Sequence, residues 1–370
     1  MIDGFVVDRL IGSGGFSDVF LFEQQSPRRR VAVKTLLPAD LSHRQRAAFS
    51  AEADVMARLS THPYIVTIHQ TGVAHDGRPY LVMEYCSRPS LSERYKRRPL
   101  SVVDALRVGI RLAGAVATAH SFGILHGDIK PSNVLTNDYG WPALADFGIA
   151  SDVAAARRPA GVDAATETDE TIGISVPWAP PEMFVDVPMP DVRSDVFSLA
   201  ATIHTVLAGR TPFEVAGGPN GTADLIARIQ RGQLTPIWRE DVPSSLSAAL
   251  AKAMSPRRDD RFSSAVEFAR ALQQVERELG AEPTAIEVPV DEGIGSEVGG
   301  DAGGNGELDA TGGGGAGPSG ATLEASAPRI PVVPTTRRRI AVAVLVAVLA
   351  VLSIGAVVLA VDLGAAALLR

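Results

Sequence analysis

Short apolar runs of the kind that form strands recur through the first part of residues 1–280. The runs are Phe5–Val7, Val19–Phe22, Val31–Lys34, Tyr64–Ile68 and Pro79–Met83. The first two flank a glycine-rich turn, which predicts a β-hairpin. We therefore expect a small, strand-rich lobe at the start of the chain.

Apolar residues at helical spacing begin within residues 43–59, where Phe49 and Met56 fall on one face. Longer segments of the same kind follow, for example at 101–121 and 193–208. The pattern predicts an α+β fold in which a larger helical lobe follows the strand-rich one. The junction of two such lobes is a natural place for a ligand.

The composition changes beyond residue 280. Residues 281–336 are rich in Gly, Pro, Ala and Glu and include Gly312–Gly315. Such a segment cannot bury enough apolar surface to offset its loss of conformational entropy, so we expect a disordered linker. A flexible chain of this length would span roughly 40 Å root-mean-square.

A membrane anchor is predicted at the end of the chain. Three arginines at 337–339 precede the uncharged run 340–361. As a helix, that run would be about 33 Å long, enough to cross a bilayer, although a core helix is the alternative interpretation. The arginines mark the cytoplasmic side, so residues 1–280 are expected in the cytoplasm at the plasma membrane. Residues 362–370 would form a short external tail that is too small for a sensor domain.

Composition and charge narrow the classes of function. The chain has 370 residues, a net charge of -7 and one cysteine, Cys86, which excludes an internal disulfide. Residues 281–336 hold nine acids and one arginine, so the rest of the chain is close to neutral. This charge distribution gives no argument for nucleic-acid binding. The first residues lack the charged and apolar regions of a signal peptide.

The stretch Ile124–Leu135 carries the most distinctive chemistry. Asp128 can accept a proton from a hydroxyl, and Lys130 can lie beside a phosphate. Pro131 supports a rigid loop because it fixes φ and lacks an N–H. The amide oxygen of Asn133 is a hard ligand that suits Mg²⁺. An acid, a cation and a metal ligand on one loop are what placing a phosphate against a hydroxyl requires.

This loop, Asp-x-Lys-Pro-x-Asn, resembles the catalytic loop of serine/threonine protein kinases. The resemblance implies that Asp128 is the catalytic base, that Lys130 stabilises the transferring phosphoryl group and that Asn133 binds a metal ion. Gly127 replaces an arginine that usually grips a phosphorylated activation loop. The replacement removes the usual partner of a phosphorylated activation loop, so it bears on activation by phosphorylation. It does not bear on catalysis itself.

Two further stretches resemble the nucleotide-binding part of that family. Gly12–Val19 is similar to the glycine-rich loop, with Ser17 in place of the third glycine. Lys34 follows at the spacing of the lysine that holds the ATP phosphates, although an exposed strand-end lysine is the plainer interpretation. Its implied partner is Glu52 on the following helix, with Asp54 as the weaker candidate.

The remaining nucleotide contacts are also implied by the resemblance. Met83 would stand at the back of the adenine pocket, a role that burial as ordinary core would match equally well. Backbone groups of 84–86 would bind the adenine edge. The full set of implied nucleotide-binding residues is Ile11, Gly12, Ser13, Gly14, Gly15, Val19, Ala32, Lys34, Glu52, Met83, Glu84, Cys86 and Leu135.

Asp146, in Asp-Phe-Gly, matches the family's aspartate that binds the Mg²⁺ bridging the phosphates, and a divalent ion is needed to neutralise the triphosphate. Residues 149–182 would be the activation segment. Within it, Ser175 falls where the family usually has a threonine that bonds the catalytic aspartate. The segment also holds three threonines that could be autophosphorylated or could belong to a plain polar loop, namely Thr166, Thr168 and Thr171.

The resemblance implies two structural supports as well. Glu182 ends the segment, after Pro180 in place of the usual alanine, and should pair with Arg261. Asp195 resembles the helix aspartate that braces the catalytic loop, although it could simply be an acid near a helix start. A buried ion pair of this type fixes geometry more reliably than it adds stability.

Together these motifs cover roughly residues 1–275 and look like bacterial membrane-anchored kinases of the eukaryotic type. The resemblance implies a non-specific serine/threonine protein kinase that uses ATP and Mg²⁺ on protein substrates. One alternative is a membrane-anchored pseudokinase scaffold, for which Gly127 and Pro180 leave room. Another is phosphoryl transfer to a small molecule, which Lys130 and the Pro-Pro-Glu segment disfavour. The sequence leaves open whether the chain is a monomer or a dimer.

Overall fold

The computed structural model describes residues 2–14, 17–37, 43–147 and 175–289, all within one compact unit, Met1–Gly295. No helix of these residues is both long and apolar enough to cross a bilayer. Several predictions concern residues outside the described ranges, namely Gly15, Thr166, Thr168, Thr171, the linker from 290 to 336, the arginines 337–339 and the span 340–361.

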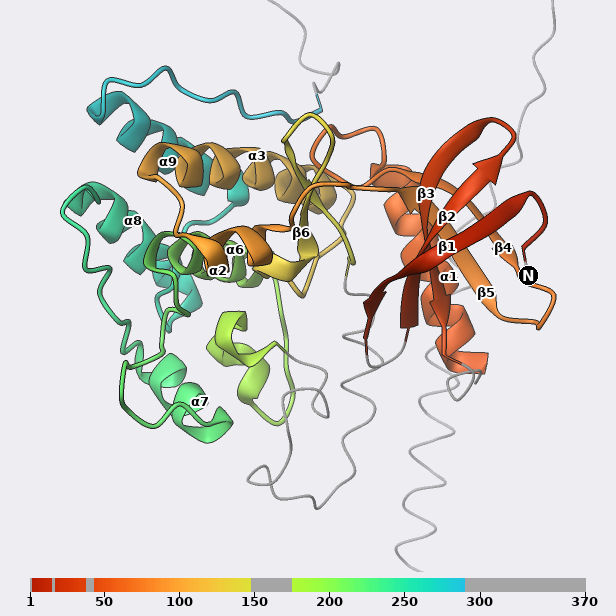
Figure 1. Cartoon of the computed structure of the whole chain (residues 1–370). Coiled ribbons are helices and arrows are strands. Elements are labelled where there is room, and N and C mark those ends of the chain that lie inside the picture. Colours follow the sequence, from red (N-terminus) through yellow and green to blue (C-terminus); the bar gives the residue numbers. More distant parts are fainter. Residues whose placement is uncertain (1, 15–16, 38–42, 148–174, 290–370) are drawn as a thin grey trace, which may run out of the picture. The chain divides into compact units, whose positions relative to one another are not determined.

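The N-terminal lobe is a five-stranded antiparallel sheet with the order β1-β2-β3-β5-β4 (Figure 1). Its strands are β1 (Phe5–Ser13), β2 (Ser17–Gln25), β3 (Arg28–Leu36), β4 (Ile68–Val73) and β5 (Pro79–Glu84). The predicted hairpin is confirmed as β1 and β2. The predicted helix over 43–59 is confirmed as α1 (His43–Leu59), which packs against β4 and β5.

One strand prediction was wrong. The run Tyr64–Ile68 is a loop, and β4 begins only at Ile68. The backbone of Tyr64 and Val66 bonds instead to Leu144, across to the helical lobe. Because Tyr64, Ile65 and Val66 are buried, the run is apolar without being a strand of the sheet. A short apolar run alone does not distinguish these two cases.

Helices dominate the second lobe, as predicted. Its α-helices are α2 (Leu91–Arg97), α3 (Val102–Ser121), α6 (Val192–Ala208), α7 (Thr222–Arg231), α8 (Ser244–Ala253) and α9 (Ala265–Glu278). Its shorter elements are η2 (Pro131–Asn133), β6 (Val134–Thr136), β7 (Pro142–Leu144), η3 (Val176–Trp178), η4 (Pro181–Phe184) and η5 (Arg258–Asp260). The small hairpin of β6 and β7 follows the predicted catalytic loop directly.

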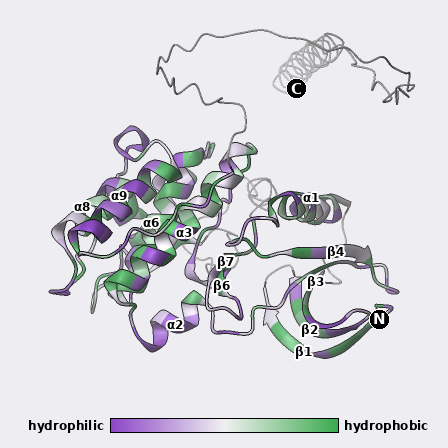
Figure 2. Cartoon of the chain, turned by 90° about the horizontal axis from the view of Figure 1, so that it is seen from above, coloured by the Kyte–Doolittle hydropathy of each residue, from purple (hydrophilic) through white to green (hydrophobic). Residues whose placement is uncertain are grey.

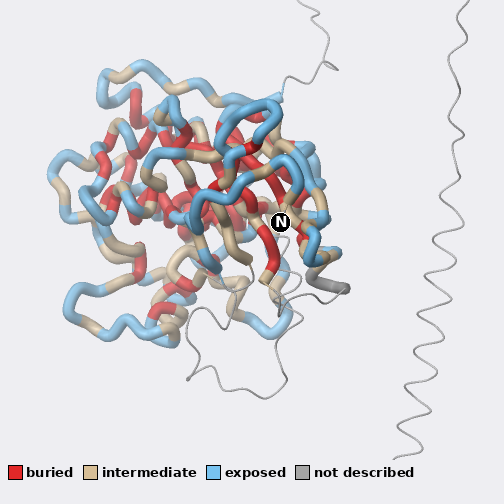
Figure 3. Tube along the Cα trace, turned by 45° about the vertical axis from the view of Figure 1, so that its right-hand side comes forward, coloured by how far each residue is buried: buried red, intermediate tan, exposed pale blue. Residues whose placement is uncertain are grey.

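The core of this lobe is built on α3 and α6. Both helices carry buried apolar residues along most of their length, and α6 is buried from Ser194 to Leu207. Figure 2, coloured by hydropathy, shows green hydrophobic stretches on the helices of this lobe. Ser101 caps α3 and Asp191 caps α6 through side-chain hydrogen bonds to the first turn, which satisfies helix N–H groups that have no partner inside the helix. Buried segments gather inside the lobe and exposed loops surround them (Figure 3). This rigid interior is the base on which the loops of the site rest.

The structure describes residues 281–289, which the sequence had assigned to the start of the linker. After α9, residues 281–289 run along the helical lobe in extended form, and Ile286 packs against the main hydrophobic core (Figure 1). The assignment to the linker was made from composition. Composition does not show that a few well-placed polar and apolar side chains can hold a short segment in place.

Candidate active site

Three charged side chains from distant parts of the chain meet at the junction of the lobes. Lys34 of β3 donates to Glu52 of α1 at 2.7 Å and to Asp146, which follows β7, at 3.0 Å. The predicted pair with Glu52 is therefore present, whereas Asp54 is exposed. One cation faces two carboxylates, so this cluster has an excess of negative charge that a divalent ion would balance.

The surroundings shift the pKa values of these groups. Burial lowers the pKa of Lys34, but the carboxylates of Asp146 and Glu52 outweigh it and raise that pKa above its ordinary value. Burial raises the pKa of Glu52 against the pull of Lys34. The Lys34 cation lowers the pKa of Asp146. Asp146 is therefore the more firmly ionised carboxylate, and its side chain is also the more exposed, at 47% against 14% for Glu52.

Strand register places the predicted adenine-contacting residues on one face of the sheet. Val19 lies opposite Lys34, and Ala32 lies opposite Met83. Ala32 and Lys34 are two residues apart on β3, so all four side chains share that face. The apolar members join the main hydrophobic core, which Leu135 and Cys86 also touch. Ile11, by contrast, is 39% exposed.

The glycine-rich turn between β1 and β2 is closed by its own backbone. The Gly14 amide donates to the Ser17 carbonyl at 2.9 Å, and the Ser13 hydroxyl donates to Asp18 at 2.8 Å. Gly12 lies opposite Val19 in the register. The turn therefore folds over the same end of the sheet that carries Lys34, and Ser17 closes it where the family pattern has a glycine.

The backbone around Cys86 continues from β5 toward the helical lobe. The Glu84 amide donates to the Thr67 carbonyl at 2.9 Å. Cys86 is half-buried, and burial raises the pKa of its thiol to about 12. The thiol is therefore protonated at neutral pH, and it behaves as a small apolar side chain in the wall of the predicted pocket.

The predicted catalytic loop brings its polar side chains together. Lys130 lies 2.7 Å from the Asp128 carboxylate and donates to the Ser175 hydroxyl at 2.6 Å. The Asn133 amide group donates to both the carbonyl and the carboxylate of Asp128, at 2.9 and 3.1 Å. Ser175 thus reaches Asp128 through Lys130. Asp128 stays one-third exposed, so a hydroxyl can approach it.

Asp195 braces this loop from α6. Its carboxylate accepts from the His126 and Gly127 amides at 2.8 and 2.9 Å and lies 2.8 Å from the His120 ring. Burial opposes ionisation of Asp195, but the hydrogen bond from His120 and the nearby histidines outweigh it and lower the pKa. The predicted brace is therefore present, whereas the cap of α6 is Asp191.

His126 links the loop to the segment that carries Asp146. Its Nε2 donates to the Ala145 carbonyl at 3.1 Å, and its Nδ1 accepts from the Asp128 amide at 3.2 Å. These two bonds require the neutral ring, in agreement with the pKa of His126, which burial lowers. Sequence reasoning had assigned no role to His126 or to His120, and their polar bonds to backbone and carboxylate only become visible in three dimensions.

The structure gives a reason for Gly127. Its φ is +75°, in the left-handed region that side chains rarely adopt, so an arginine at this position would be strained. Asp146 is the one non-glycine residue with positive φ in the described ranges, at +57°. A backbone conformation of this kind costs about 1–3 kcal/mol and is found most often at functional sites.

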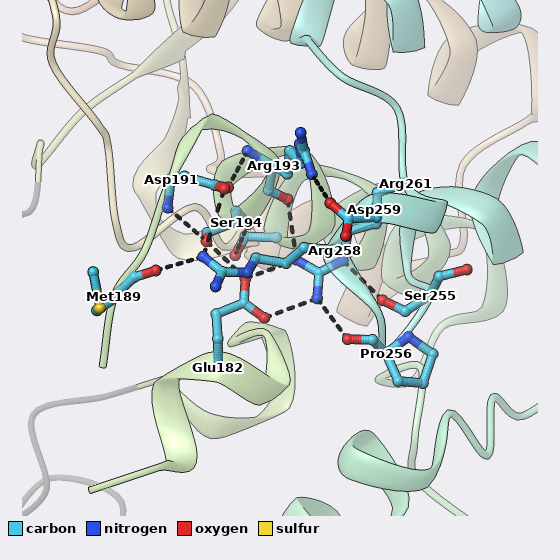
Figure 4. Close-up of polar contacts among 11 residues, drawn as sticks. Glu182, Met189, Asp191, Arg193, Ser194, Ser255, Pro256, Arg258, Asp259 and Arg261 are labelled. Carbon is cyan, nitrogen blue, oxygen red and sulfur yellow. Dashed lines mark hydrogen bonds and ion pairs between the residues drawn. The ribbon is translucent and has the colours of Figure 1, made fainter. Parts of the chain in front are cut away.

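A second ion pair fixes the end of the activation segment to the helical lobe (Figure 4). Arg261 donates from two guanidinium nitrogens to the two carboxylate oxygens of Glu182, at 2.7 and 2.8 Å. Ser194 donates to the same carboxylate. The Arg261 side chain is fully buried and that of Glu182 is 9% exposed. The predicted pair is present, in a short turn that begins after Pro180.

The arrangement fits a divalent ion held with the help of phosphates. Asn133 and Asp146 lie on neighbouring segments, because the Ala145 amide donates to the Asn133 carbonyl at 2.9 Å. Since the Asn133 NH₂ group is engaged by Asp128, its amide oxygen is left for a cation. No cluster of three or more His, Cys, Asp or Glu side chains that could hold a metal occurs in the described residues. Mg²⁺ typically uses few protein ligands and completes its shell with phosphates and water.

A two-lobed fold with this lysine–glutamate pair and this Asp/Asn loop defines the protein kinase class. Comparison of the sequence with family models agrees, because residues 5–275 match the protein kinase domain. The chain belongs to this family.

The similar proteins are bacterial kinases. Serine/threonine-protein kinase PknK of Mycobacterium tuberculosis is 37% identical over 285 residues, which are 77% of this chain and 25% of PknK. PknF of the same organism is 33% identical over 73% of this chain and 56% of PknF. This chain therefore spans only part of both relatives, about a quarter of PknK. A crystal structure of a mutant M. tuberculosis PknI kinase domain shares 27% identity and a TM-score of 0.53, over 74% of this chain and 96% of that kinase-domain chain.

Proposed function

We propose that this chain is a serine/threonine protein kinase that transfers the γ-phosphoryl group of ATP to serine and threonine hydroxyls of proteins. The observation that supports the proposal most is that Lys34, Asp128, Asn133 and Asp146 are linked by short contacts at one place, although the sequence separates them by up to 112 positions. Relatives named as serine/threonine-protein kinases support the same assignment.

Each side chain has a role that follows from its contacts. Asp128, held by the amide of Asn133, orients the acceptor hydroxyl and takes its proton. Lys130 touches Asp128, and its cation stabilises negative charge on the phosphoryl group during transfer. Lys34, kept cationic by Glu52 and Asp146, holds the phosphates of ATP. A bound Mg²⁺, held by Asn133 and Asp146, would neutralise charge between the phosphates.

The position of the activation segment beside the catalytic loop also supports a protein acceptor. Ser175 lies in the predicted activation segment and accepts a hydrogen bond from Lys130, so the segment reaches the catalytic loop. The following turn is fixed by Glu182 and Arg261. A fixed platform beside the base suits a peptide better than a small molecule. A pseudokinase scaffold would have no need to keep all four of Lys34, Asp128, Asn133 and Asp146.

The test is Asp128→Asn in the full chain, assayed with radiolabelled ATP and a protein acceptor. Loss of the base should lower the rate of transfer by about 10²–10⁴-fold. Binding of MgATP should stay within twofold of wild type, because Asp128 lies on the acceptor side. Asp54→Asn is the matched control, since Asp54 is exposed on α1, and it should have no effect. Unchanged turnover in Asp128→Asn would contradict the assignment.

We also propose that residues 340–361 anchor the kinase in the plasma membrane, with the kinase domain in the cytoplasm. The support is the uncharged run of the sequence, preceded by three arginines. The full chain should remain in the membrane fraction after alkaline extraction, whereas residues 1–336 should be released. Release of the full chain would end this proposal.

The acidic linker should hold the kinase away from anionic lipid. Its charge repels the inner leaflet, so neutralising the acids of 290–336 should increase binding of residues 1–336 to anionic liposomes. Unchanged binding would refute the idea.

We further propose Thr166, Thr168 and Thr171 as autophosphorylation sites, and mass spectrometry after incubation with MgATP checks this.

A further inference from the structure

Residues 281–289, called the strap here, lie beyond the part of the chain that matches the kinase family, which ends at residue 275. The strap leaves the end of α9 and runs back along the helical lobe toward the strand-rich lobe (Figure 1). It is held at Thr284, Ile286 and Glu287, by contacts of three different kinds.

The first contact is a set of three hydrogen bonds at Thr284. Its amide and its hydroxyl donate to the two carboxylate oxygens of Glu276, each at 2.7 Å. The Gln273 side chain donates to the Thr284 carbonyl at 2.7 Å. Glu276 is fully buried, so its carboxylate depends on these donors. A buried carboxylate is costly without its donors, so these bonds tie the strap firmly to α9.

The second contact is the close approach of the strap to α3. A Cβ atom on Gly114 would lie 2.5 Å from the Glu287 carbonyl oxygen, closer than any real side chain allows. Gly114 lies inside a 20-residue helix, where glycine is less favourable than alanine. The close approach of the strap explains why a glycine occupies this position in the helix. Ile286 packs against the core beside it.

The third contact joins the strap to the loop that follows α1. The Glu287 carbonyl accepts from His62 Nε2 at 3.0 Å, and His62 Nδ1 accepts from the Tyr64 amide at 3.1 Å. These bonds require the neutral ring with the proton on Nε2. His62 is itself 7% exposed, and its backbone amide donates to the Leu59 carbonyl in the last turn of α1.

This loop connects the two carboxylates that face Lys34. On one side it continues α1, which carries Glu52. On the other side, Tyr64 and Val66 bond to Leu144, two residues before Asp146. A shift of the loop therefore moves both carboxylates relative to Lys34. The strap contacts the loop at the point where these two connections meet.

We propose that the strap is a positioning element of the nucleotide site. It holds the loop at His62 and thereby keeps Glu52 and Asp146 in place around Lys34, so that detachment of the strap weakens ATP binding. Thr284, Glu287, Glu276 and His62 are positioning residues for the phosphate-binding cluster. The proposal rests on the proposed function in one respect, that this cluster binds the phosphates of ATP.

Gly114→Ala in the full chain is the sharpest test, because alanine favours the helix and yet blocks the Glu287 backbone. We expect hydrogen exchange at the Thr284 amide to become at least about tenfold faster, and exchange in residues 60–66 to increase. The dissociation constant for MgATP, measured by equilibrium binding, should rise about fivefold, the low end of usual coupling between sites.

Glu276→Gln should weaken the attachment of the strap at Thr284 and weaken MgATP binding in the same way. Glu278→Gln is its matched control, since Glu278 is exposed on the same helix, and it should resemble wild type. A strap that only stabilises the fold would lower the melting temperature but leave MgATP affinity unchanged well below that temperature. That result in both variants, with exchange showing the strap released, would overturn the proposal. Fast exchange at Thr284 in wild type would overturn it too.

The two proposals fail in different ways. If wild type binds MgATP but transfers no phosphate to proteins, the proposed function fails, and the affinities of the Gly114→Ala and Glu276→Gln variants still decide the role of the strap. If wild type transfers phosphate and both variants bind MgATP as wild type does, only the strap proposal fails.

Discussion

Lys34 and Arg261 are both cations held by carboxylates, but their surroundings differ. Lys34 joins elements of two lobes, shares two carboxylates, and leaves one of them, Asp146, half exposed. Arg261 meets Glu182 in two parallel hydrogen bonds within the helical lobe, and the pair is closed to solvent. The open cluster can exchange partners with a ligand, whereas the closed pair can only hold its shape. Substitution of Arg261 should therefore change mainly stability, and substitution of Lys34 mainly activity.

The largest expected effect is on the closed pair. Arg261→Met leaves Glu182 buried with its charge, and removing one partner of such a pair costs about 3–5 kcal/mol of unfolding free energy. Chemical unfolding monitored by circular dichroism measures it. Arg193→Met is the matched control, because Arg193 pairs with the exposed Asp259 nearby (Figure 4), and it should cost less than about 1 kcal/mol.

A double variant tests the reason for this loss. Arg261→Met combined with Glu182→Gln removes both charges, so it should be less unstable than Arg261→Met alone. If the double variant were the less stable of the two, the buried charge would not be the cause.

At the open cluster the main effect should be on activity. Lys34→Met should lower kcat/KM for ATP by about 10²–10³-fold, the usual result of removing one preorganised electrostatic contact. Its loss of stability should be smaller than that of Arg261→Met, because Asp146 is exposed to water and the raised pKa of Glu52 lets it take up a proton. Steady-state kinetics and chemical unfolding give both numbers. Arg30→Met, on the exposed start of the same strand, should match wild type in both.

The smallest effect concerns pH. His204 of α6 is 1% exposed; its Nε2 donates to the Thr235 carbonyl at 2.9 Å, and its Nδ1 has no partner among the described residues. Burial lowers the pKa of His204 from 6.5 to about 4. Between these values the unfolded chain binds the proton and the folded chain does not, so stability is lost as pH falls. The loss should reach roughly 3 kcal/mol near pH 4.

Unfolding curves at pH 7, 5.5 and 4.5, for wild type and His204→Gln, measure this slope. The variant should show a shallower decline. Lys34 acts in the opposite direction, because its raised pKa means that its contribution is present at neutral pH and fades only in alkali. Equal slopes in wild type and variant would show that another group titrates.

Much of the site could be predicted because its chemistry is local in sequence. Asp128, Lys130 and Asn133 share one loop, and periodicity was enough to find the helix that carries Glu52. The helical interior was also predictable, since the apolar positions of α3 and α6 repeat at helical spacing. These features depend on neighbours along the chain.

The missed features depend on neighbours in space. Tyr64–Ile68 was predicted as a strand because its residues are apolar, but their partner is Leu144 in the other lobe. His126 and His120 gave no signal, since a histidine bonded to backbone or to a distant carboxylate looks like any other in sequence. Gly114 was the one available sign of the strap, because a glycine inside an otherwise strongly helical segment indicates a close approach.

The state of Cys86 has a practical consequence for studying this protein. Burial raises the pKa of this thiol to about 12, so the reactive thiolate is scarce at neutral pH. Since it is the single cysteine of the chain, a second one introduced at an exposed position would react with a maleimide dye almost alone. Fluorescent labels can therefore be attached at chosen positions in either lobe while the native residue stays in place.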